Sequence, residues 1–182
     1  MLPTAHTSIG FLISQIKIKG KSLSTLEIIF VVFCANVFDL DLIYVYLGGQ
    51  TTYHHLLVSH TPLFAVGLIA LFTLIFRLNW RVALLGFVAM LSHFVLDDLC
   101  YWLYLFGITE DGKPEIFWLF PFDPRREEAL RLYSSLRPTV GGFLVSYIKH
   151  PLFIFEWIFL ISATSVFANK YSSLLKKVFF KR

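Results

Sequence analysis

The chain alternates long apolar runs with short polar turns, and this pattern predicts helices. The long runs each approach the roughly 20 residues that a helix needs to cross a bilayer, and they cover about residues 24–47, 62–80, 80–106 and 151–168. A shorter apolar run over residues 1–16 predicts an N-terminal helix that does not cross alone. Ser24 and Glu27 have capping-box spacing at the start of one long run, with Ser22 as the alternative cap. We therefore expect an all-α, polytopic membrane helical bundle of four long spans plus a short N-terminal helix.

The composition supports a single membrane-embedded domain over residues 1–182. Hydrophobic residues make up 57% of the chain and charged residues only 15%, a balance that is unusual for a soluble domain of this length. The net charge of +4 is better explained by basic turns at a membrane surface than by binding to nucleic acid, because no base-reading motif is present. We expect the membrane as a partner and no nucleic acid.

Lysine and arginine residues are distributed unequally between the turns. Ten of them fall in three clusters that an alternating bundle places on one side, at residues 17–21, 77–81 and 170–182. The loop over residues 48–61 has none, and the six in the loop over residues 107–150 are balanced by six acidic residues. The positive-inside rule therefore predicts that the clusters face the cytoplasm across the inner membrane, and that both loops face the other side.

His93 and Asp97 stand four residues apart inside an apolar run. One helical turn separates them, so both side chains share a helix face and could bind one metal ion or each other. Ionisable groups at membrane depth are costly and normally face a polar interior. We interpret the pair as part of a metal site, with a purely structural hydrogen-bonded pair as the alternative.

Three histidines, His54, His55 and His60, lie close together in the loop before Pro62, which can open the next helix. Neutral imidazole is a common zinc ligand, and carboxylates from a neighbouring helix can complete a mixed site. The alternative is that these histidines are interfacial polar residues.

Asp39 and Asp41 interrupt another apolar run. Two residues apart, they point to different faces of an α-helix, so either the helix breaks there or one of them supports a ligating histidine. All the candidate ligands fall in the non-cytoplasmic half of the predicted bundle or just above it, which favours one shared site.

The order of these motifs resembles the integral-membrane metal-dependent hydrolase family, which is distantly similar to zinc-dependent phospholipase C. The matching segments extend over about two-thirds of the chain, and they are Ala5-His6, Phe38-Asp39-Leu40-Asp41, His55 to His60, Ser92-His93 with Asp97, and Trp118 to Asp123 followed by Arg125 and Arg126. The resemblance implies metal ligation by a set of imidazoles and carboxylates, with His60 as ligand or acid beside His6, Asp39 or Asp41, His55, His93 and Asp97.

Several positions depart from the family pattern. Phe38 stands where the family has proline, and Leu56 stands where it has an arginine that could clamp a phosphate or carboxylate. The soluble phospholipases use a further histidine and glutamate for a third zinc, whereas His150 and Glu156 here are six residues apart, off the helical-turn spacing. We therefore expect one or two divalent ions, with zinc as the first choice.

The loop over residues 107–150 is predicted to be an outer cap. Asp123 and Pro124 suit the start of an amphipathic helix that lies on the membrane interface. Arg125 and Arg126, together with His54, are candidate substrate contacts, since guanidinium groups bind anionic headgroups. Alternatively, the two arginines only pair with neighbouring glutamates or with lipid phosphates.

These features together predict a membrane-bound hydrolase whose metal-activated water attacks an amphiphile, first a phosphoester lipid and second an amide or ester lipid. Asp39, Asp41 or His60 would accept or return the proton. A metal-ion or proton transporter and a non-catalytic membrane protein are the alternatives. A transporter predicts polar residues toward the cytoplasmic half, where the runs are almost purely apolar. The oligomeric state is left open.

Overall fold

The structure, a computed structural model, describes residues 2–43, 55, 57–110, 112–123 and 147–179. Within these ranges the chain is helical and contains no β-strand, which confirms the all-α prediction. The elements in chain order are α1 (Pro3–Ser14), α2 (Thr25–Asn36), η1 (Val37–Leu40), η3 (Val58–His60), α4 (Pro62–Phe76), α5 (Trp80–Asp97), α6 (Leu99–Leu105) and α9 (Leu152–Phe179).

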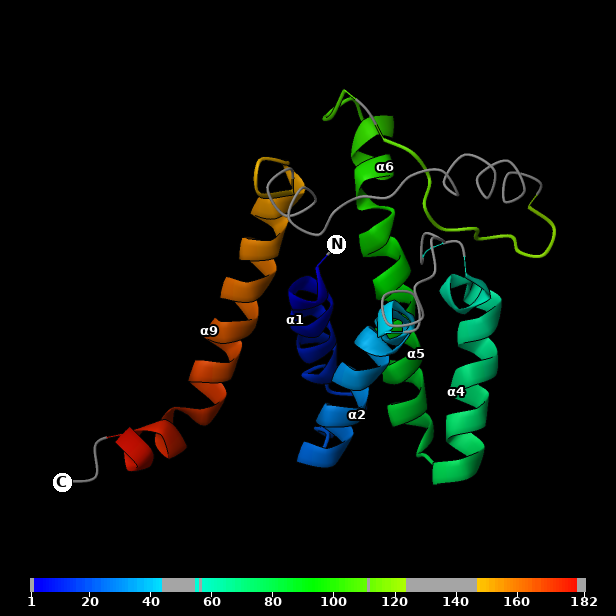
Figure 1. Cartoon of the computed structure of the whole chain (residues 1–182). Coiled ribbons are helices and arrows are strands. Elements are labelled where there is room, and N and C mark those ends of the chain that lie inside the picture. The colour runs from blue at the N-terminus through cyan, green and yellow to red at the C-terminus, as the bar shows by residue number, and fades with distance from the viewer. Residues whose placement is uncertain (1, 44–54, 56, 111, 124–146, 180–182) are drawn as a thin grey trace.

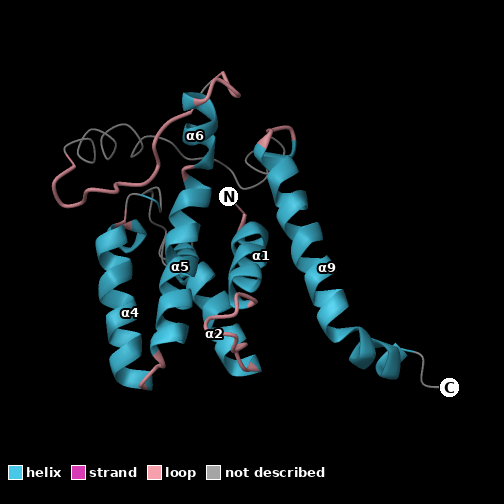
Figure 2. Ribbon diagram, turned by 180° about the vertical axis from the view of Figure 1, so that it is seen from behind, coloured by secondary structure: helices cyan, strands magenta, loops and turns pink. Residues whose placement is uncertain are grey.

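Helix α5 lies at the centre of the bundle. It packs against α1, α2 and α4, while α9 packs against α1 on the outer side (Figure 1). The view from behind shows the same order, with α4 and α9 at the two flanks (Figure 2). Helix α6 continues the direction of α5 beyond the other helices. The first half of the chain therefore forms a bundle around α5, and α9 joins it through α1.

The core is an apolar cluster between α2, α4 and α5. Phe38, Phe94 and Met90 are its largest fully buried side chains, and each such side chain stabilises the fold by about 1.5–3 kcal/mol when it leaves water. Helix α1 reaches this core through Gly10, where a Cβ atom would lie only 2.6 Å from the Cβ of Ala35. A glycine at this position thus lets α1 approach α2 closely.

The prediction of four long spans is wrong within the described residues. Only α5 and the Leu152–Ser172 part of α9 are both long and apolar enough to cross a membrane, while α4 has 15 residues and α2 has 12. The apolar runs that predicted α2, α4 and α5 were longer than these helices, because the helices end inside the runs. Hydropathy is averaged over many residues, so it does not reveal a helix end inside an apolar run.

Each break has a local cause. Ser24 and Glu27 form the predicted capping box at the start of α2, and the chain tightens into the 3-10 helix η1 after Asn36. Helix α5 stops at Asp97, and Asp98 separates it from α6, so the predicted 80–106 span is two helices. Helix α4 ends at Arg77, which has a left-handed conformation with φ of 48°.

The bundle has two chemically different ends. The basic turns at residues 17–21 and 77–81 connect α1 to α2 and α4 to α5 at the lower end in Figure 1. The start of α1, the end of α2, the start of α4 and the end of α5 lie toward the opposite end. The candidate ligands belong to these latter segments, so they are gathered away from the basic turns.

Candidate metal centre

Two neighbouring groups of side chains could each hold a metal ion. In each group one donor atom per residue lies within 4.8 Å of the others. The groups are His6, Asp39 and His93, and His55, His60 and Asp97. They bring together α1, η1, α5 and the segment before α4, so residues far apart in the sequence meet in one place. Of the predicted ligands that the structure describes, all but Asp41 belong to these two groups.

His93 is held in one orientation by a backbone contact between helices. Its Nδ1 lies 2.9 Å from the carbonyl oxygen of Ala35 on α2. Because a carbonyl only accepts, Nδ1 carries the proton and donates, which leaves Nε2 to face the pocket. That Nε2 lies 3.2 Å from Oδ2 of Asp97 and 3.7 Å from Oδ1 of Asp39. The Nδ1 hydrogen bond fixes the ring orientation, as the acceptor behind a metal-binding histidine does.

Asp97 joins the two groups. Its Oδ1 lies 3.2 Å from Nε2 of His6, and its Oδ2 lies 3.7 Å from Nε2 of His55 as well as close to His93. The carboxylate is 4% exposed. A buried carboxylate with imidazoles beside both oxygens would contribute to holding a cation in either group.

His55 and His60 present their rings in the same way as His93. The Nδ1 of His55 contacts a carboxylate oxygen of Glu115, and the Nδ1 of His60 lies 2.9 Å from Oδ2 of Asp41. Asp41 also accepts a hydrogen bond of 2.7 Å from the hydroxyl of Ser59. Three imidazoles therefore have an oxygen atom beside Nδ1, and Asp41 contacts His60 rather than facing the centre of the pocket with both oxygens.

The 3-10 helix η1 resolves the two alternatives that the sequence leaves open for the acidic pair. The regular helix ends before Asp39, and the tighter winding directs Asp39 toward His93 and Asp41 toward His60. Phe38, directly before Asp39, is 2% exposed and its ring lies 4.6 Å from that of Phe94. The aromatic contact keeps η1 against α5, so the helix break and the support of a histidine occur together.

The electrostatics of the loop histidines differ. Burial lowers the pKa of His60, and its hydrogen bond to Asp41 offsets only part of that effect. Burial also lowers the pKa of His55, but the carboxylates of Asp97 and Glu115 outweigh it and leave this pKa above its ordinary value. Neutral imidazole is the metal-binding form, so the local environment favours that form in His60 and disfavours it in His55.

The residues present fit a divalent cation. His93 Nε2, Asp39 Oδ2 and Asp41 Oδ1 are buried and have no hydrogen-bond partner among the described residues, although buried polar atoms are normally paired. The rings of His6 and His93 stack with centroids 4.0 Å apart, an arrangement that disfavours a positive charge on both. A metal ion satisfies the lone pairs and the carboxylates at once, and imidazole with carboxylate is a donor set that zinc accepts.

Two carboxylates that the sequence does not single out complete the surroundings of the centre. Glu115 orients His55, as described above. Asp98 is 1% exposed and accepts from the backbone N–H groups of Glu115 and Ile116 and from Nε1 of Trp118, at 2.7, 3.0 and 2.6 Å. Asp98 thereby ties the segment that carries Glu115 to the end of α5. Its adjacency to Asp97 was the only signal in the sequence.

Some predicted residues lie outside the described part of the chain. They include the candidate substrate contacts His54, Arg125 and Arg126 and most of the predicted cap with its amphipathic helix. His150 and Glu156 were the pair considered for a third ion. His150 accepts a hydrogen bond at Nδ1 from the backbone N–H of Leu152, and Glu156 accepts one at the start of α1. Neither belongs to the two groups described above.

Comparison with known proteins gives a family but no chemistry. No curated protein and no solved structure matches the sequence significantly. A family model described as YdjM inner membrane protein matches residues 1–174, nearly the whole chain. Its description names a location and no reaction, and it agrees with the two apolar helices long enough to cross a bilayer. The chain belongs to the YdjM inner membrane protein family.

Proposed function

We propose that this protein is a membrane-bound, metal-dependent hydrolase that cleaves an amphiphilic phosphoester, with one or two zinc ions at the site of His6, Asp39, His55, His60, His93 and Asp97. The observation that carries the proposal is the convergence of four imidazoles and two carboxylates, with an oxygen atom beside Nδ1 in three of the imidazoles. Purely structural ion pairs do not need this common orientation, whereas metal ligands do.

The side chains divide the chemical work. A bound divalent ion supplies an activated water and neutralises charge that develops on a phosphoryl oxygen. Asp97 holds both groups of ligands in register through its two oxygens. Asp39 directs Oδ1 toward His93 and keeps Oδ2 buried without a hydrogen-bond partner. We assign this Oδ2 as the atom that accepts the proton of the water, and Asp41 as the residue that positions His60.

An apolar groove beside the centre supports an amphiphilic substrate. It has a volume of about 370 Å³ and starts at Val58 and Thr61, the residues on either side of the Ser59-His60 pair. It follows α4 past Leu68 to Leu71, and Phe120 forms part of its wall. A hydrocarbon chain in this groove would bring an attached polar group toward the histidines.

The interior between the centre and the basic turns favours hydrolysis over transport. The buried side chains of α2 and α5 in this direction are apolar, among them Ile28, Val31, Val82 and Leu85. An ion pathway needs polar groups along its length. A site that opens to one end only is suited to an enzyme.

The proposal is tested in two steps on the full-length protein purified in mild detergent. Elemental analysis measures bound zinc in the wild type, in Asp97→Asn and His93→Ala, and in Glu110→Gln, whose exposed carboxylate lies outside the centre. We expect stoichiometric zinc in the wild type and Glu110→Gln, and loss of zinc in the other two. Full zinc in both site variants would overturn the metal centre.

The second step measures release of water-soluble phosphate or phosphorylated headgroup from phosphatidic acid, phosphatidylglycerol and lysophospholipids in mixed micelles. We expect hydrolysis that a chelator abolishes and zinc restores, and that Asp97→Asn lacks. A protein that binds zinc but releases nothing from any of these lipids would leave the metal centre standing and overturn the phosphoester reaction.

A further inference from the structure

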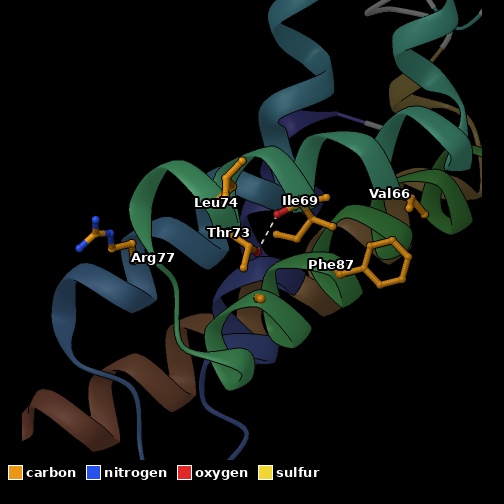
Figure 3. Close-up of a pocket in the computed structure, with 8 residues that line it drawn as sticks. Val66, Ile69, Thr73, Leu74, Arg77 and Phe87 are labelled. Atoms are coloured by element: carbon orange, nitrogen blue, oxygen red, sulfur yellow. Dashed lines mark hydrogen bonds between the residues drawn. The ribbon is translucent and has the colours of Figure 1, made fainter.

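A groove on the described surface lies away from the metal centre, between α4 and α5 near the basic end. It has a volume of about 720 Å³. Figure 3 shows Val66 and Phe87 toward one end, Ile69 and Thr73 along the middle and Arg77 beyond the last turn of α4. The metal centre uses none of these residues, so the groove needs an explanation of its own.

The groove is open to the outside, and its lining is apolar because of its side chains. Ala70 and Ala83 are small, and they leave space between the larger Ile69, Leu74 and Phe87. The only hydroxyl, that of Thr73, donates to the carbonyl of Ile69 at 2.7 Å, shown by the dashed line in Figure 3. No free polar group of the lining therefore faces the groove before Arg77, and the groove suits a hydrocarbon chain.

Arg77 gives the groove a charged end. Its side chain is exposed, it points away from the apolar lining in Figure 3, and it has no ion pair with another described residue. From Val66 to Arg77 the helix rises by about 16 Å at 1.5 Å per residue. The hydrocarbon region of one bilayer leaflet is about 15 Å thick. The apolar stretch and the guanidinium are thus separated like the acyl chain and the phosphate of one phospholipid.

We propose that this groove binds an anionic phospholipid, with one acyl chain along Ile69, Ala70 and Ala83 and the headgroup phosphate on Arg77. The charge selects the lipid, because a guanidinium and a phosphate form paired, charge-assisted hydrogen bonds, while a zwitterionic headgroup offsets its own phosphate. The chain belongs to a family of inner membrane proteins, so phospholipid is available to the groove. This proposal does not depend on the metal centre or on hydrolysis.

The experiment uses native mass spectrometry of the full-length protein in mild detergent, titrated with phosphatidylglycerol or with phosphatidylcholine of the same acyl chains. Arg77→Gln removes the charge of the groove, and Arg81→Gln removes the same charge from a residue that does not line it. Ala83→Leu fills the groove, and Val88→Leu adds a methylene on the exposed face of α5 outside it. Circular dichroism and the elution volume check that each variant is folded.

We expect the wild type to retain one phosphatidylglycerol and to prefer it over phosphatidylcholine. Arg77→Gln should weaken binding of phosphatidylglycerol about fivefold, the effect of one basic residue at an anionic surface, and should abolish the preference. Ala83→Leu should weaken binding of both lipids, and the two control variants should match the wild type. Equal binding of both lipids by the wild type, unchanged binding by folded Arg77→Gln, or a dimer that excludes lipid from the groove would each overturn the proposal.

Discussion

Asp39 and Asp41 are two residues apart, yet the structure gives them different partners. Asp39 faces His93, whereas Asp41 accepts from Ser59 and lies 2.9 Å from Nδ1 of His60. The difference follows from the 3-10 winding of η1, which directs the two side chains to imidazoles on different elements. A carboxylate that orients a histidine contributes to metal affinity through that histidine.

We predict that Asp41→Ala weakens zinc affinity about 10- to 100-fold without removing the site, because His60 loses the acceptor that orients its ring. Asp41→Asn keeps an oxygen that can accept from His60, so its loss should be smaller. Competition with a chromophoric chelator measures both affinities. Wild-type affinity in Asp41→Ala would mean that Asp41 does not act on a ligand.

The candidate ligands could be found from the sequence because each carries a local signal. His93 and Asp97 have helical-turn spacing, and His55 and His60 belong to a cluster of histidines. Glu115 had no such signal, since it lies in a long loop and reaches His55 only in the folded chain. Asp98 is also invisible to periodicity, because it acts at the break between two helices.

At the scale of the elements, the start of α2 depends on a capping box at the basic end of the bundle. The backbone N–H of Ser24 donates to Glu27 at 2.7 Å, and the hydroxyl of Ser24 accepts from the N–H of Glu27. These hydrogen bonds lower the pKa of Glu27 below its ordinary value. The carboxylate therefore stabilises the folded state above the unfolded pKa, and this contribution is lost as the pH falls through the lowered pKa.

We predict that Ser24→Ala lowers the free energy of unfolding by about 1 kcal/mol. Ser22→Ala should have no effect, since Ser24 and not Ser22 caps the helix. Thermal unfolding in detergent measures the difference at neutral pH. Glu27→Gln should remove a small loss of stability that the wild type shows as the pH falls below about 4.5, and an identical acid profile in this variant would contradict the role of the carboxylate.

Gly10 lets two helices that carry site residues lie close together. A Cβ at this position would meet the Cβ of Ala35 at 2.6 Å and the backbone of Val32 at 3.2 Å. We predict that Gly10→Ala costs about 1–3 kcal/mol, as overpacking usually does, and also weakens zinc binding because α1 carries His6. Gly67→Ala is the matched control on α4, where nothing lies within 4 Å of the added carbon. This variant should be neutral or stabilising by up to about 1 kcal/mol, and equal effects of the two would refute the helix contact.

The lengths of the helices were harder to predict than their presence. The apolar runs did locate α2, α4, α5 and α9, because hydropathy reports which segments avoid water. Hydropathy does not report where a helix ends at a polar residue, as the helices do at Asn36, Asp98 and Arg77. The positions of these helix ends depend on contacts between segments. Two of the ends, at η1 and at Asp98, lie next to the metal centre.

At the scale of the whole molecule, the chain's last long helix supports the metal centre from a distance. Glu156 on α9 is 5% exposed, and its carboxylate accepts from the N–H of Leu2, the hydroxyl of Thr4 and the hydroxyl of Tyr147 at 2.7, 2.6 and 2.6 Å. A carboxylate at a helix N-terminus also stabilises the helix dipole. Helix α1 has no side-chain cap of its own, so a membrane-crossing helix supplies its cap.

This arrangement predicts long-range coupling between α9 and zinc. Glu156→Ala leaves buried donors unsatisfied, each at a cost of about 1–3 kcal/mol, and it frees the start of α1, one turn before His6. We expect zinc affinity to fall although Glu156 contacts no ligand, and we expect Glu156→Gln, which keeps an acceptor oxygen, to lose less. Thermal unfolding with and without zinc measures the effect, since a ligand stabilises the folded state by a free energy that grows with the logarithm of its affinity. Ile158→Ala, at an exposed position on the same helix, controls for damage to α9, and a folded Glu156→Ala protein with wild-type zinc stabilisation would show that the two ends of the chain are not coupled.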